Sequence, residues 1–181
     1  MGRVLFAGAL MLLSIPLTAG ERVILLTGFE PFGGAKINAS WEAVKFFQGK
    51  TIAGHRVETV QLPVVYDAIE APLKEAIAKF KPAAVLCFGE GTPAIQIETI
   101  ARNGYHAAKP PDNKGLPPPR EKIVPNGKDE IPTGLPVQEI VQAIRSTQVH
   151  SITSEDAGGY LPNLNRIFAQ SLCGAQCTGE L

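Results

Sequence analysis

Short apolar runs alternate with segments of helical periodicity along most of the chain. Continuous or alternating apolar residues predict strands at residues 23–27, 57–62 and 83–88. Between them, residues 66–80 repeat apolar side chains at helical spacing, and Asn38 or Ser40 is placed to cap a second helix. This alternation favours a mostly parallel sheet flanked by helices, an α/β fold with three α/β/α layers.

The second half of the chain is less regular. Residues 93–107 lack a helical period and predict an extended arm or hairpin, and the proline-rich residues 110–132 predict a long surface loop. Order returns with three expected elements: a helix from Pro136 to about residue 144, a strand at 149–153 and a helix at 160–172. Ligands bind beyond the carboxyl ends of parallel strands, so the loops after residues 27, 89 and 153 are expected to share one crevice.

Composition narrows the function classes. The 181 residues suit one domain, and 17 basic residues balance 17 acidic ones, so no global field favours nucleic acid or anionic lipid. Neither a Walker sequence nor Gly-x-Gly-x-x-Gly is present, and the three cysteines lack zinc-site spacing. We therefore expect no cofactor and no metal.

The first 20 residues differ from the rest. Arg3 precedes a short apolar run and a small-residue cluster that ends at Gly20, which is typical of a secretory signal and too short for a stable membrane span. The alternatives are a hydrophobic first strand or a mis-called start codon. We expect a signal peptide at 1–20, a folded domain at 21–181 and a periplasmic or secreted location. Cys173 and Cys177, four residues apart, could then pair.

Candidate chemistry gathers after the expected strands. Phe29 and Phe32 lie on a glycine-rich loop, where they could clamp a flat small molecule or simply pack in the core. Glu98 has apolar neighbours, as a tuned catalytic acid or the exposed side of an alternating strand would. Glu90 is a second acidic candidate, and Arg102 could partner either carboxylate.

Residues 156–163 follow an expected strand and precede an expected helix. A turn of this kind presents a side chain at a helix N-terminus, where the helix dipole lowers a thiol pKa. Here the presented residue is Pro162, which has neither thiol nor hydroxyl. Proline is well tolerated in a first helical turn, so the fold need not suffer.

Several uncommon stretches occur in an order that resembles the pyroglutamyl peptidase I family, the pyrrolidone-carboxylate peptidases. These are cysteine-type omega peptidases that remove N-terminal pyroglutamate, and the family is usually cytoplasmic. The resemblance runs from about residue 23 to about residue 172. The matching stretches are 26–34 (LTGFEPFGG), 38–44 (NASWEAV), 98–103 (ETIARN), 111–115 (PDNKG), 133–136 (TGLP) and 157–163 (AGGYLPN).

The resemblance implies roles for individual residues. Glu98 matches the acid of the family's Cys-His-acid triad, and Pro162 stands at the nucleophile position. The pocket for the pyrrolidone ring would be lined by Phe29, Phe32, Tyr160 and Leu161. The family histidine belongs to a later strand, and the three histidines present, His55, His106 and His150, match nothing catalytic.

The sequence therefore predicts a pyroglutamyl peptidase I-like protein with impaired catalysis, short of the last strand and helix of the family fold. One alternative is a pseudoenzyme that binds pyroglutamyl peptides or a related small amide. Another is a truncated gene product. An oligomer is compatible with all three.

Overall fold

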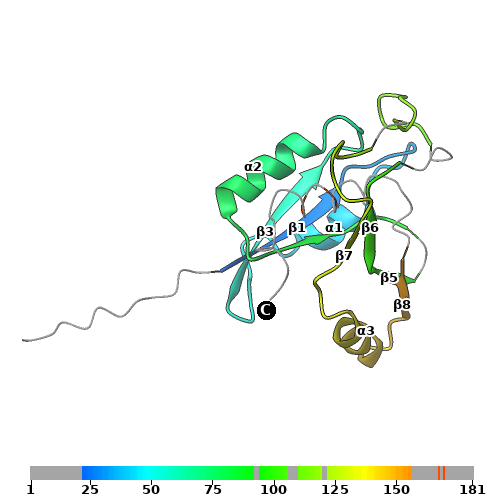
Figure 1. The fold of residues 1–181 in the computed structure, drawn as a ribbon. Helices are drawn as coiled ribbons and strands as arrows, with labels where there is room; N and C mark the ends of the chain where they lie inside the picture. Colours follow the sequence, from blue (N-terminus) through cyan, green and yellow to red (C-terminus); the bar gives the residue numbers. More distant parts are fainter. Residues whose placement is uncertain are drawn as a thin grey trace, which may run out of the picture.

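The computed structural model describes residues 22–91, 94–105, 110–119 and 122–155, together with Ile167 and Ala169. Helices and strands alternate along this part of the chain, which confirms the predicted α/β fold (Figure 1). The helices are α1 (Ala39–Lys45), α2 (Glu70–Phe80) and α3 (Val137–Ser146). The strands are β1 (Val23–Phe29), β2 (Thr51–Ile52), β3 (His55–Leu62), β4 (Ala84–Cys87), β5 (Ile95–Glu98), β6 (Ile100–Arg102), β7 (Glu130–Pro132) and β8 (Ser151–Ser154).

The largest sheet has the strand order β2-β3-β1-β4. Strand β1 pairs in parallel with β3 along its whole length, from Val23 opposite Arg56 to Phe29 opposite Leu62, and it pairs in parallel with β4 on its other side. Because β1 is flanked on both edges and covered on both faces, its near-continuous apolar sequence fits a central strand.

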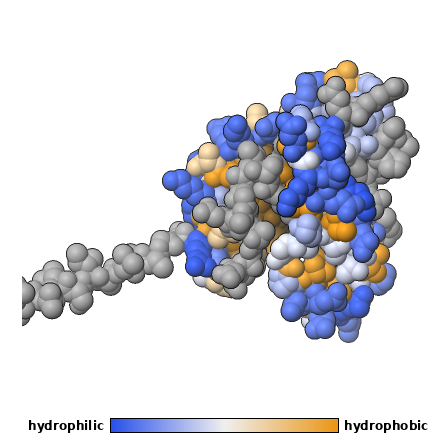
Figure 2. Space-filling model, in the orientation of Figure 1, coloured by the Kyte–Doolittle hydropathy of each residue, from blue (hydrophilic) through white to orange (hydrophobic). Residues whose placement is uncertain are grey.

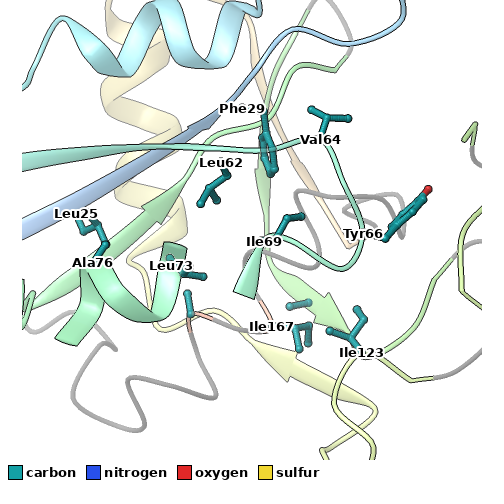
Figure 3. Packing of buried hydrophobic residues seen from close by; sticks show 12 residues of the cluster. Leu25, Phe29, Leu62, Val64, Tyr66, Ile69, Leu73, Ala76, Ile123 and Ile167 are labelled. Carbon is teal, nitrogen blue, oxygen red and sulfur yellow. The ribbon is translucent and has the colours of Figure 1, made fainter. Parts of the chain in front are cut away.

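The two faces of this sheet are covered by different helices. Consecutive side chains of a strand point to opposite faces. Leu25 packs in one cluster with Leu73 and Ala76 of α2, as Figure 3 shows, whereas Leu26 packs with Val44 of α1 in a second cluster. The predicted α/β/α layering is therefore present around β1.

The strand expected at 149–153 and the strands of the middle segment lie outside this mostly parallel sheet. β5 pairs in parallel with β8, and β6 pairs antiparallel with β7, each as a separate two-stranded unit. None of the four β5 residues is buried, whereas an interior parallel strand needs apolar cover on both faces. Arg145 of α3 donates to the carbonyl oxygen of Ser151 in β8 at 3.1 and 2.8 Å, and hydrophilic residues cover the outer side of this helix (Figure 2).

Some element boundaries differ from the sequence expectation for local reasons. The helix expected at 66–80 begins at Glu70, because a turn in which Ala68 N donates to Val65 O precedes it. The last expected strand begins at Ser151, after Gln148 takes a left-handed conformation with φ of 65°. Of the helix expected at 160–172, Ile167 and Ala169 are helical and buried.

Two expectations concern residues outside the described part of the chain. The leader at 1–20 and the pair Cys173 and Cys177 lie there. Among the residues that the structure does describe, no helix has the length and apolar character needed to cross a membrane.

Gly28 marks a close approach between β1 and α1. A Cβ atom at this position would lie 2.8 Å from both the backbone nitrogen and the Cα of Trp41. Backbone atoms cannot rotate away as a flexible side chain can, so the helix would have to shift. Gly28, the first glycine of the stretch at 26–34, therefore has a packing role.

We expect Gly28→Ala to lower the free energy of unfolding by about 1–3 kcal/mol, the usual cost of overpacking. Urea unfolding monitored by circular dichroism would measure the change. Gly91→Ala is the matched control, because a Cβ there would have no atom within 4 Å; its effect should stay within about 0.5 kcal/mol. Equal stabilities of the two variants would contradict the packing role.

Candidate functional site

The loop that follows β1 contains a tight turn at its two adjacent glycines. Ala35 N donates to Phe32 O at 3.0 Å, and Gly33 and Gly34 have φ values of 60° and 80°. Positive φ at both central positions is the signature of a type I′ turn, which glycine adopts without strain. Phe32 is the first residue of this turn and lies half-buried against the core cluster that contains Phe29.

Asn38 closes the far end of this loop and caps α1, one of the two caps that the sequence allowed. Its Oδ1 accepts from Ser40 N at 2.9 Å and from Ser40 Oγ at 2.6 Å. Its Nδ2 donates to Glu30 O at 3.1 Å, and Ser40 Oγ accepts from Phe29 N at 3.1 Å. These bonds tie the helix start to the end of β1.

Glu30 is a connecting residue that the sequence analysis did not single out. Its Oε1 accepts from Val64 N at 2.9 Å and from Asn113 Nδ2 at 3.1 Å. Asn113 Nδ2 also donates to Pro31 O at 2.9 Å. The only signal in the sequence is an acid between two aromatic residues of a loop, which does not specify its partners.

Asp112 holds the neighbouring segment in place. Its Oδ1 accepts from Lys114 N at 2.9 Å and Leu116 N at 3.0 Å, and its Oδ2 accepts from Tyr66 N at 3.1 Å. Burial raises the pKa of this carboxyl, but the backbone bonds from Leu116, Tyr66 and Lys114, with the Lys114 charge, outweigh it, so the pKa lies below its ordinary value. Residues 110–116 are therefore anchored to the loop after β3.

Glu90 connects the loops after β1 and β4. Its Oε2 accepts from Ala39 N at 2.8 Å, where the loop after β1 leads into α1. Phe88 N, directly after β4, donates to Thr27 O within β1 at 2.9 Å. These two loops meet, as expected for neighbouring parallel strands. The sequence left Glu90 as an acidic candidate, and its observed contact is that of a helix-capping carboxylate.

Glu98 is the last residue of β5 and lies opposite Ser154, the last residue of β8. Thr99 donates to Ser154 O through its backbone nitrogen at 2.7 Å and its hydroxyl at 3.0 Å. Glu98 Oε2 is buried and has no hydrogen-bond partner among the described residues. A buried carboxylate oxygen therefore lies beside the strand that leads directly to residues 156–163.

Other candidates stand as follows. Arg102, considered as a partner for Glu98 or Glu90, forms an exposed ion pair with Glu130 across β6 and β7. Phe29 is 3% exposed and belongs to the core, as the packing alternative anticipated. Tyr160, Leu161 and Pro162 lie outside the described residues. Within the described ranges, no group of three or more His, Cys, Asp or Glu could hold a metal ion.

Comparisons with known proteins agree on one family. The pyroglutamyl peptidase family model matches residues 22–173. Pyrrolidone-carboxylate peptidase 2 of Photorhabdus laumondii is 40% identical over 145 residues, 79% of this chain and 66% of that protein. The pyrrolidone-carboxylate peptidase of Bacillus velezensis is 38% identical over 79% of this chain and 67% of its own length. The chain thus spans about two thirds of these curated relatives.

Solved structures show the same similarity. Pyroglutamyl peptidase I of Bacillus amyloliquefaciens superposes with a TM-score of 0.75 at 36% identity, covering 80% of this chain and 71% of that one. The pyrrolidone carboxyl peptidase of Thermococcus litoralis gives a TM-score of 0.78 at 32% identity, with 83% and 69% coverage.

Asp112 generates a prediction about pH. Because its pKa in the folded state lies below the ordinary value of 3.8, the ionised carboxylate stabilises the fold above that value. The contribution is lost as pH falls through the lower folded-state pKa. Asp112→Asn should therefore lower the free energy of unfolding by about 1–3 kcal/mol at pH 7, and the difference from wild type should shrink below about pH 4.

Urea unfolding at pH 7, 5 and 3 would measure this difference. Asp67→Asn is the matched control, since its side chain is 70% exposed and its ion pair with Lys114 is 3.4 Å long. That change should cost less than about 1 kcal/mol. A constant difference between Asp112→Asn and wild type across the three pH values would show that the charge is not what stabilises the segment.

Proposed function

This chain belongs to the pyroglutamyl peptidase family, and we propose that it binds the N-terminal pyroglutamyl residue of peptides while hydrolysing the following bond very weakly. The observation that carries the second half is Pro162 in the stretch AGGYLPN at 157–163. The first half is supported by the family match over residues 22–173 and by the arrangement of the loop that follows β1.

Recognition in this proposal uses the aromatic loop. A pyroglutamyl group is a small, flat lactam with an amide edge, and such ligands suit an apolar wall with a few convergent hydrogen-bond groups. Phe32 supplies a half-buried ring in the loop after β1, and Phe29 supports it from the core. Tyr160 and Leu161 are proposed to complete the wall from the segment that follows β8.

Impairment follows from the chemistry of the family reaction. A cysteine peptidase needs a thiolate to attack the scissile carbonyl, a histidine to move the proton and an acid to orient the histidine. Proline at position 162 offers no group that could attack the carbonyl. Removing the nucleophile of a triad hydrolase lowers kcat by about a millionfold.

We propose that Glu98 is the acid of the family triad, retained in a chain that no longer carries out the peptidase reaction. Its register opposite Ser154 and its buried, unpartnered Oε2 support this assignment, since an orienting acid has to lie near the nucleophile segment. The same observation is what favours the alternative, an active peptidase with a rearranged site.

We further propose that residues 21–181 form the binding domain and that residues 1–20 direct its export.

An activity measurement separates the two alternatives. The purified protein at micromolar concentration should release no fluorophore above buffer from a pyroglutamyl aminomethylcoumarin substrate, because it lacks the attacking sulfur. Phe32→Ala, purified identically, controls for contaminating host peptidase, which would give equal rates in both samples. Release by wild type that greatly exceeds release by Phe32→Ala would establish an active peptidase.

A binding measurement tests the retained pocket. Pyroglutamyl-alanine at millimolar concentration should raise the melting temperature of wild type, because a ligand that binds only the folded state stabilises it by mass action. Phe32→Ala should abolish the shift, and alanyl-alanine, which lacks the lactam ring, should produce none. An unchanged melting temperature of wild type at 10 mM ligand would contradict the proposed recognition.

A further inference from the structure

Asn113 connects the loops that follow β1 and β3. Its backbone nitrogen donates to Val64 O at 2.9 Å. Its side-chain Nδ2 donates to Glu30 Oε1 at 3.1 Å and to Pro31 O at 2.9 Å. One residue of the 110–116 segment therefore bonds to two loops that lie 83 and 49 positions earlier in the chain.

The contacts form a closed ring. Val64 N donates at 2.9 Å to Glu30 Oε1, the same atom that accepts from Asn113. Glu30 N in turn donates to Leu62 O at 2.9 Å. Each link therefore limits the movement of the next, so the carboxylate and the amide fix each other's position. The acceptor is a carboxylate, and hydrogen bonds to carboxylates are stronger than those between neutral groups.

Phe32 lies next to this ring of hydrogen bonds. It directly follows Pro31, whose carbonyl oxygen accepts from Asn113, and it opens the turn at Gly33 and Gly34. Glycine residues place few restrictions on the backbone, so the turn itself does little to fix the aromatic ring. The bond from Asn113 to Pro31 holds the peptide group next to Phe32.

We propose that Asn113 is a positioning residue, which sets the Phe32 side chain for recognition of the ligand through the carboxylate of Glu30 and the carbonyl of Pro31. This inference rests on the proposed function for its ligand, a lactam ring at a peptide N-terminus. It adds a residue that does not touch the ligand and that nevertheless determines affinity.

The side chain of Asn113 can be removed without releasing its segment. Asp112 anchors residues 110–116 independently through three backbone amides, and the bond from Asn113 N to Val64 O does not involve the side chain. Asn113→Ala should therefore fold and free only the contacts to Glu30 and Pro31. Asn113→Asp is a stronger change, because it places a second carboxylate against Glu30.

Titration calorimetry with pyroglutamyl-alanine at 15 °C tests the inference. We expect the Kd to rise at least about fivefold in Asn113→Ala, the lower end of common coupling effects, and further in Asn113→Asp, with unchanged stoichiometry. A merely structural role would lower the melting temperature and leave the Kd unchanged. Asn126→Ala, at an exposed position, should bind as wild type does.

Amide hydrogen exchange of the free protein provides the readout that needs no ligand. In Asn113→Ala the amides of Ala35 and Val64 should exchange faster than in wild type, because both belong to the linked loops. Unchanged exchange there, or an unchanged Kd, would overturn the positioning role. Absence of binding by wild type would instead overturn the proposed function, and the exchange result would still decide whether Asn113 holds the loop.

Discussion

The parallel pairing of β1 with β3 and β4 is the constraint on which the other arrangements depend. It puts Leu25 and Leu26 on opposite faces, so that α2 and α1 each have an apolar surface to cover. It also ends at Phe29 opposite Leu62, which brings the loops after β1 and β3 out of the sheet side by side. The contacts of Glu30 with Val64 and Asn113 follow from that register, because a shift by one residue would turn every side chain of β1 to the other face.

Amide-to-carboxylate bonds, more than ion pairs, hold the loops at this end of the sheet. Glu30 and Asp112 accept from backbone or side-chain amides that the fold places in fixed positions. The exposed ion pairs of the described residues, such as Lys122 with Asp129, are worth at most about 1 kcal/mol each. The loops therefore depend on short-range hydrogen bonds, which salt screens far less than it screens exposed charges.

The sequence predicted what local periodicity determines and missed what tertiary contacts determine. The three strands β1, β3 and β4, the Asn38 cap and the buried Ile167 all follow from apolar spacing or capping chemistry. The bond between Glu30 and Asn113 joins positions 83 apart, and no pattern within either stretch specifies it. Likewise, the sequence suggests Glu98 or Glu90 as possible partners of Arg102, whereas the antiparallel register of β6 and β7 places Glu130 opposite it. The proline-rich stretch predicted as a surface loop contains the buried Asp112. The sequence around Asp112 indicates a turn, but it does not indicate the hydrogen bond that Asp112 accepts from Tyr66 N.

The groups that maintain this fold are separate from the group that performs the family reaction. Gly28, Glu30 and Asp112 act through packing and backbone amides at the ends of β1 and β3, and none of them requires a thiol at position 162. Proline fits a first helical turn without losing a needed donor. Under the proposed function, proline takes the nucleophile position, which would lower turnover about a millionfold at little expected cost in stability. Under that proposal the loop scaffold is kept when catalysis is lost, and this is why recognition and hydrolysis need separate measurements in this protein.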